Sequence, residues 1–163
     1  MSIAVFAGSF DPFTMGHLDI VQRAAPHFEK FYIAIFKNPG KQNDRFRLDE
    51  RMQQIGDAVQ GLRNVYVTEF SGLVVDYCRS IGADCLVRGI RNGSDVDYER
   101  QLESVNRKLA PEIETMFLLS KPEFAHISSS LVKQLMDINI SIDGLVPDAE
   151  HIIFTKRRDS YGQ

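Results

Sequence analysis

The sequence lacks the features that would identify several classes of protein. It contains no tryptophan and only two cysteines, Cys78 and Cys85, in 163 residues. Neither cysteine has a second cysteine or a histidine at the spacing of metal ligands, so the sequence offers neither a disulfide framework nor a structural zinc site. We therefore expect both cysteines to be small, reduced side chains of the core.

The chain also lacks a large excess of positive or negative charge, and it has no long run of hydrophobic residues. The net charge is −3, whereas a protein whose main partner is nucleic acid usually has a basic face. No apolar run is long enough to span a membrane and no signal-peptide pattern is present, so we expect a cytoplasmic protein without a membrane or nucleic-acid partner. With 44% hydrophobic and 25% charged residues, the chain has the composition of one globular domain over residues 1–163, whose tail at 157–163 we expect to fray.

Short apolar runs of high β-propensity alternate with helical patterns along the chain. Strands are predicted at residues 3–7, 31–36, 64–70, 84–87 and 114–119. Helices are predicted from Gly16, at residues 48–59, 72–81 and 95–109, and again from Ser128 and Pro147. Such alternation implies parallel strands joined by right-handed crossovers. The sequence therefore predicts an α/β fold, a Rossmann-like doubly wound parallel five-stranded sheet with helices on both faces and a C-terminal helical segment.

Residues 8–17, with the sequence GSFDPFTMGH, join the first predicted strand to the first helix. Gly8 and Gly16 allow the backbone to turn sharply or to approach a ligand closely. A helix N-terminus offers unpaired N–H groups and a positive dipole to a phosphate, and His17 lies in the first turn. The loop matches neither a Walker loop nor a dinucleotide fingerprint, and a strand–loop–helix with two glycines also occurs in α/β proteins without a phosphate site.

Three further segments follow predicted strand ends, where ligands bind in open α/β sheets. Lys41 follows the second strand, and Arg88 and Arg91 follow the fourth, where planar guanidinium groups suit a substrate with several phosphate charges. Serines 128–130 open a late helix and suggest a second anion site. The alternatives are a solvated lysine, arginines paired in surface salt bridges and one serine acting as an ordinary N-cap.

The helix predicted at 95–109 carries acidic residues in its first turn. Asp95 and Asp97 are explained by capping and by the helix dipole. Glu99 lies next to the apolar stripe, which we expect to be buried, and it is the acid most able to turn inward and accept a hydrogen bond from a ribose hydroxyl. The stripe consists of Tyr98, Leu102, Val105 and Leu109.

Together, GSFDPFTMGH, RGIR at 88–91 and ISSS at 127–130 closely resemble the bacterial phosphopantetheine adenylyltransferases, within the nucleotidyltransferase superfamily that carries a T/H-x-G-H motif. The resemblance extends from about residue 2 to residue 150. It implies transfer of the adenylyl group of ATP to 4′-phosphopantetheine, giving dephospho-coenzyme A and pyrophosphate, with Mg²⁺ carried by ATP and no metal held by protein residues. It also implies a homohexamer.

The resemblance further implies roles for individual residues. His17, Lys41, Arg91 and Ser129 are expected to supply donors and positive charge for catalysis. The acceptor substrate is expected to contact Ser9, Lys41, Val74 and Arg88. ATP is expected to contact Ser9, Phe10, His17, Gly89, Ile90, Arg91, Glu99, Phe124, Ala125, His126, Ile127, Ser128, Ser129 and Ser130. The chain differs from many relatives at Phe124, where Trp or Tyr is common, and at residues 42–45.

The chemistry of the expected reaction fits the residues available. A phosphate nucleophile is already anionic at neutral pH, so catalysis needs positioning and charge stabilisation rather than a strong base or a covalent intermediate. The alternatives are a nicotinamide mononucleotide adenylyltransferase or a cytidylyltransferase, whose motif usually has His where this chain has Thr14, and a non-catalytic nucleotide-sensing module. An amino-acid-activating synthetase is disfavoured, because the chain is short and lacks the lysine-rich second signature.

Overall fold

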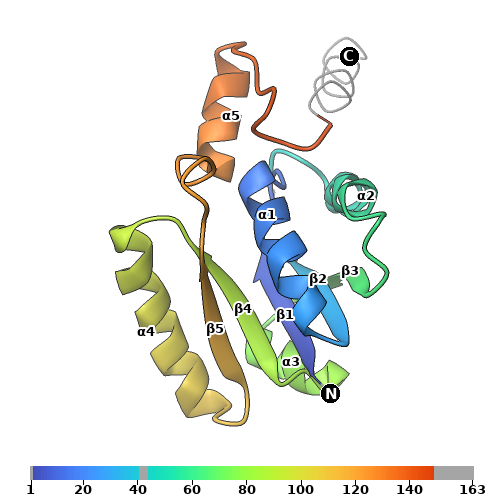
Figure 1. Ribbon diagram of the computed structural model, residues 1–163, viewed down its shortest axis with the longest axis vertical. Coiled ribbons are helices and arrows are strands. Elements are labelled where there is room, and N and C mark those ends of the chain that lie inside the picture. The colour runs from blue at the N-terminus through green and yellow to red at the C-terminus, as the bar shows by residue number, and fades with distance from the viewer. Residues whose placement is uncertain (1, 41–43, 149–163) are drawn as a thin grey trace.

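The computed structural model describes residues 2–40 and 44–148. Five strands form one sheet in the order β3-β2-β1-β4-β5, and every neighbouring pair is parallel (Figure 1). The strands are β1 (Ile3–Gly8), β2 (Lys30–Phe36), β3 (Val65–Phe70), β4 (Cys85–Ile90) and β5 (Glu114–Leu119). The predicted parallel five-stranded sheet is therefore confirmed.

Helices cover both faces of this sheet. They are α1 (Met15–Ala24), the short 3-10 helix η1 (Ala25–His27), α2 (Leu48–Ala58), α3 (Val74–Ile81), α4 (Gly93–Leu109) and α5 (Ser129–Asp137). On one face α1 and α2 pack against alternate strand residues such as Phe6 and Ile33, and on the other α3 packs against Val5 and Leu86. Successive strand residues point to opposite faces of the sheet, and both sets are apolar, as a sheet buried between two helix layers requires.

Both cysteines lie in this core, as predicted. Cys78 of α3 and Cys85 of β4 are buried, and burial raises the pKa of each thiol to about 11. Because the thiolate is the reactive form, neither residue is a nucleophile at neutral pH.

Several boundaries differ from the prediction by one or more residues, and two of them bear on the site. Strand β4 continues to Ile90, so Arg88 and Gly89 lie within the strand and pair with Phe117 and Leu118 of β5 instead of following it. Helix α4 begins at Gly93, two residues early, because the Asn92 side chain caps it. Sequence patterns define element ends poorly, since a cap or a ladder hydrogen bond decides them.

The prediction that the apolar stripe of α4 is buried is wrong. Tyr98 is 61% exposed and Val105 is 55% exposed, and Glu99 is the buried residue of this helix. The carboxylate of Glu99 faces β4, where it forms an ion pair with Arg88. The ion pair thus compensates both charges at the surface where α4 meets the sheet.

A third, smaller core holds α5 above the carboxyl ends of the strands. Phe46, Val132, Ile142 and Val146 are buried together, and the Met15 N–H donates to the Leu145 carbonyl at 2.8 Å. No helix within residues 2–40 and 44–148 has the length and apolarity needed to cross a membrane. The helix predicted from Pro147 and the tail at 157–163 lie almost wholly outside the described residues.

Candidate functional site

The candidate site lies where the direction of chain winding changes. Strands β1 and β4 are neighbours in the sheet although they are distant in the sequence, which creates the crevice in which doubly wound proteins bind ligands. A cavity of about 520 Å³ occupies this position. It is lined by the loop after β1, by the end of β4 and by the start of α5, the three segments singled out from the sequence.

Three helices begin at this cavity. Gly16 and His17 of α1, Asp95 of α4 and Ser129 of α5 all line it, and Figure 1 shows the starts of these helices at the same end of the sheet. Each N-terminus contributes the positive end of a dipole and the first-turn N–H groups that its cap leaves unpaired. Ser128 caps α5 by accepting the Leu131 N–H, as expected for one of the three serines.

The loop after β1 folds back onto itself. The Phe10 ring packs on Gly8 so closely that a Cβ at residue 8 would lie 3.2 Å from it, and Phe10 itself has a positive φ of 47°. Any larger residue at position 8 would therefore require the Phe10 ring to shift by a few tenths of an ångström. Phe10 and Phe13 are buried as a result and form part of the wall around His17.

The His17 imidazole is fixed by the cap of its own helix. Its Nδ1 accepts the backbone N–H of Thr14 at 3.0 Å, while the backbone N–H of His17 donates to the Thr14 hydroxyl at 3.3 Å. This is a capping box in which histidine occupies the place usually taken by Glu or Gln. Because Nδ1 is an acceptor, the neutral ring carries its proton on Nε2.

The surroundings of His17 hold the ring in this neutral form. Burial among Phe6, Phe10 and Phe13, and the nearby charges of Arg91 and Arg88, lower its pKa from 6.5 to about 4. Desolvation is the larger cause, since an imidazolium loses its hydration in this environment. At neutral pH the site therefore contains an uncharged hydrogen-bond donor.

Arg88 and Glu99 form a two-pronged ion pair at the cavity wall. Arg88 Nε and Nη2 donate to the two carboxylate oxygens of Glu99 at 2.8 and 2.7 Å, and Nη1 donates to the Ala7 carbonyl at 2.9 Å. A guanidinium has five N–H donors, so two remain for a ligand. Glu99, expected from the resemblance to contact ATP, has both oxygens engaged by this arginine.

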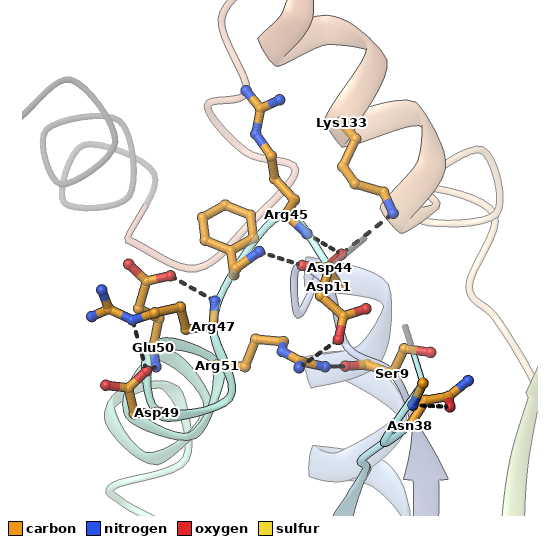
Figure 2. A network of polar contacts seen from close by, with 12 residues as sticks. Ser9, Asp11, Asn38, Asp44, Arg45, Arg47, Asp49, Glu50, Arg51 and Lys133 are labelled. Atoms are coloured by element: carbon orange, nitrogen blue, oxygen red, sulfur yellow. Dashed lines mark hydrogen bonds and ion pairs between the residues drawn. The ribbon is translucent and has the colours of Figure 1, made fainter. Parts of the chain in front are cut away.

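The other cations of the cavity are also paired with carboxylates. Arg91 contacts Asp95 at 3.1 Å and the Ile127 carbonyl at 3.4 Å, so it joins α4 to the segment before α5. Lys133 lies 3.4 Å from Asp11, whose carboxylate also accepts two backbone N–H groups (Figure 2). These pairs hold the positive groups in place before any ligand arrives.

A second cavity of about 380 Å³ adjoins the first. Both are lined by residues 7–9 at the end of β1 and by the Arg88–Glu99 pair, which therefore lies between them. The remainder of the second cavity is mainly apolar, with Asn106 and Thr115 as neutral polar groups and Glu103 as a further acidic residue. Its apolar residues are Phe36, Phe70, Val74, Leu86 and Leu102.

The structure brings together most, but not all, of the residues expected from the sequence. Ile90 is buried in the sheet, and Phe124, Ala125 and His126 are not among the residues that line either cavity. Ser129 lines the larger cavity, but its hydroxyl donates to the Pro12 carbonyl at 2.8 Å. Lys41 lies outside the described residues.

Several site residues were missed from the sequence. Thr14 lies three residues before His17 and caps the helix, and a Thr at this spacing before a first-turn polar residue is the pattern that predicts a capping box. Lys133 and Arg51 gave no signal, because their partners Asp11 and Ser9 are 122 and 42 residues away in the chain.

Comparison with known proteins identifies the family. Residues 5–135 match the model of the family described as cytidylyltransferase-like, which covers most of the chain. The chain belongs to the cytidylyltransferase-like family. It is accordingly a nucleotidyltransferase, an enzyme that joins the α-phosphate of a nucleoside triphosphate to an acceptor and releases pyrophosphate.

Solved structures show the same fold at low sequence identity. A proposed nicotinate-nucleotide adenylyltransferase from Vibrio parahaemolyticus superposes with a TM-score of 0.71 at 16% identity, covering 95% of this chain and 93% of that one. A bifunctional NMN adenylyltransferase/ADP ribose pyrophosphatase from Francisella tularensis gives 0.68 at 20% identity, covering 89% of this chain and 44% of that one. These likenesses support the doubly wound fold of this cytidylyltransferase-like chain.

The pKa of His17 makes a testable prediction. Because the folded state has a pKa of about 4 and the unfolded chain one near 6.5, the unfolded chain binds more protons between these pH values. The free energy of unfolding should therefore fall as the pH drops through this window, and His17→Gln, which cannot titrate, should show a shallower fall in urea melts. Imidazole NMR should give a midpoint near 4 and a neutral ring protonated on Nε2, whereas a midpoint near 6.5 would contradict the assignment.

Proposed function

We propose that the chain transfers the adenylyl group of ATP to 4′-phosphopantetheine, giving dephospho-coenzyme A and pyrophosphate. The observation that carries the proposal is the pair of adjoining cavities that share the Arg88–Glu99 pair. Three helix N-termini and several cations surround the larger cavity and suit a triphosphate. The smaller cavity suits an acceptor whose phosphate reaches Arg88.

The lining of the smaller cavity favours this acceptor over a mononucleotide. Phe36, Val74 and Leu102 provide an apolar wall, and Asn106 can hydrogen-bond to an amide. A long, uncharged amide arm with one terminal phosphate matches that lining. The positively charged ring of nicotinate or nicotinamide mononucleotide would meet a mostly apolar wall, and Glu103, which could offset that charge, is already paired with Arg107.

The reaction we propose needs no base and no covalent enzyme intermediate. An oxygen of the acceptor phosphate attacks the α-phosphorus of ATP, a new P–O bond forms, and the bond to the bridging oxygen breaks to release pyrophosphate. The His17 Nε2–H donates to an α-phosphate oxygen as charge develops, and Arg91 and the start of α5 stabilise the phosphates that leave. Lys41 and Ser9 contact the acceptor phosphate in this scheme.

The magnesium ion enters this scheme as part of the substrate. Within the described residues, no group of three or more His, Cys, Asp or Glu side chains is placed to hold a metal. Asp11, Asp95 and Glu99 are each engaged by a cation. An ion bound by the triphosphate would neutralise phosphate charge, and the residues above act on the phosphates directly.

Self-association into a homohexamer belongs to the same proposal. Tyr98, Leu102, Val105 and Leu109 on α4 and Met116, Phe117 and Leu119 on β5 are exposed apolar side chains on neighbouring elements. An apolar surface of this kind is typical of an interface. It supports association between copies of the chain.

The central experiment measures pyrophosphate release from the purified chain with ATP and Mg²⁺ in the presence of single acceptors. We expect turnover with 4′-phosphopantetheine and little with nicotinate or nicotinamide mononucleotide. Replacing ATP by CTP tests which nucleoside triphosphate the chain uses. Preference for a mononucleotide would replace the proposed acceptor. ATP binding without release for any acceptor would favour a nucleotide sensor.

Two substitutions of His17 separate its structural and chemical roles. Gln can take the N3 place of a capping box, but its amide N–H groups lie on a flexible chain and do not reproduce the position of the ring Nε2–H. His17→Gln should therefore fold with near-normal stability and lose catalysis, by up to about 2.7–4 kcal/mol if the Nε2–H acts like one donor of an oxyanion hole. His17→Ala should lose a similar amount of kcat and also about 1 kcal/mol of stability. Near-normal turnover of either folded variant would refute the role of the imidazole.

Substitution of Arg88 tests the boundary between the cavities. Arg88→Ala should raise KM for the acceptor about tenfold to a hundredfold, the cost of a lost hydrogen bond to a charged group, and change KM for ATP much less. Since this variant leaves Glu99 buried without its partner, the double variant Arg88→Met with Glu99→Gln is the matched control for folding. Unchanged acceptor kinetics in the double variant would count against the assignment.

A further inference from the structure

Arg51 is a buried charge to which neither the family resemblance nor the proposed reaction gives a role. It lies on α2 and is 3% exposed. Its Nη1 donates to the Ser9 carbonyl at 2.8 Å, and its Nη2 contacts the Asp44 carboxylate at 3.0 Å. Figure 2 shows the guanidinium extending from α2 to the loop after β1.

Stability alone accounts poorly for this arginine. Its Nε is buried and finds no hydrogen-bond partner within residues 2–40 and 44–148. A buried donor left unpaired costs about 1–3 kcal/mol, and a buried ion pair often stabilises a protein no better than apolar residues of the same size. The role of Arg51 is therefore to be sought in the groups that it contacts and not in its contribution to stability.

The bond to the Ser9 carbonyl orients a whole peptide group. The peptide between Ser9 and Phe10 is trans, so its carbonyl and its N–H point in opposite directions. With the carbonyl held toward Arg51, the Phe10 N–H points away from α2. This N–H makes no hydrogen bond to any of the described residues, and both Ser9 and Phe10 line the larger cavity.

The conformation of Phe10 makes such a restraint necessary. Its φ of 47° is one that non-glycine residues rarely adopt, and such a conformation persists only when surrounding contacts fix it. The buried ring, packed on Gly8, fixes the side chain. The Arg51 guanidinium fixes the peptide that precedes it.

We infer that Arg51 is a positioning residue that aims the Phe10 N–H into the larger cavity as a donor to a phosphate of the bound nucleotide. Phe10 lines only the larger of the two cavities, so the effect falls on the nucleotide and not on the acceptor. The inference rests on the proposed function, because it takes that nucleotide to be ATP.

The test compares ATP with adenosine, which lacks the phosphates. Isothermal titration calorimetry on the full chain measures both ligands with Arg51→Met, and with Arg79→Met, which removes an exposed arginine and its ion pairs on α3. We expect Arg51→Met to weaken ATP about tenfold, as for one lost hydrogen bond to a charged group, and to leave adenosine within about twofold. Arg79→Met should leave both affinities unchanged.

A second variant keeps the inference testable if Arg51→Met does not fold. Arg51→Lys retains the positive charge opposite Asp44 but lacks the planar fork that reaches two acceptors, so it should fold and weaken ATP by about threefold or more with adenosine unchanged. Equal weakening of ATP and adenosine in a folded variant, or no weakening of either, would overturn the inference. Failure of the unsubstituted chain to bind ATP would instead overturn the proposed function.

Discussion

The hydrogen bond from the Thr14 backbone N–H to His17 Nδ1 is the interaction on which the site depends. It caps α1, and at the same time it fixes the imidazole with its proton on Nε2. The ring remains neutral because burial against Phe10 and Phe13, together with the nearby charges of Arg91 and Arg88, lowers its pKa. The Phe10 ring reaches this position by folding back against Gly8, where a Cβ would lie 3.2 Å from it. One local arrangement thus begins the helix and prepares a neutral donor.

Electrostatic pairing organises the rest of the cavity. Arg88, Arg91 and Lys133 each face a carboxylate, so their side chains are already ordered before a polyphosphate binds. Because these cations are partly compensated, helix N-termini and the N–H groups that the carboxylates leave unused must supply much of the attraction for phosphate. On α4 the same pairing occurs at Glu99, which faces the sheet, while the apolar stripe of the helix is exposed.

The sequence predicted the sheet well because its signal is local. Strands buried on both faces are short runs of apolar, β-prone residues, and β1 and β2 are such runs. The glycines and turn residues between the strands can be recognised in the sequence equally well. The stripe of α4 was misjudged because periodicity shows that a helix has an apolar face but does not say which partner covers it. The extension of β4 through Arg88 was missed because its pairing with β5 is a contact between distant segments.

For the site, the sequence by itself determined the kinds of groups available: a glycine-bounded loop, a histidine in a first helical turn, two arginines near one strand end and a serine-rich helix start. The tertiary structure decided how they are used. It places Arg88 between two cavities and pairs Glu99 with that arginine. It also brings Arg51 into hydrogen-bond contact with the Ser9 carbonyl, 42 residues away in the chain. The physical reason is that an ion pair or hydrogen bond forms between whichever groups the fold brings within about 3 Å, and sequence spacing sets that distance only within a helix, strand or turn.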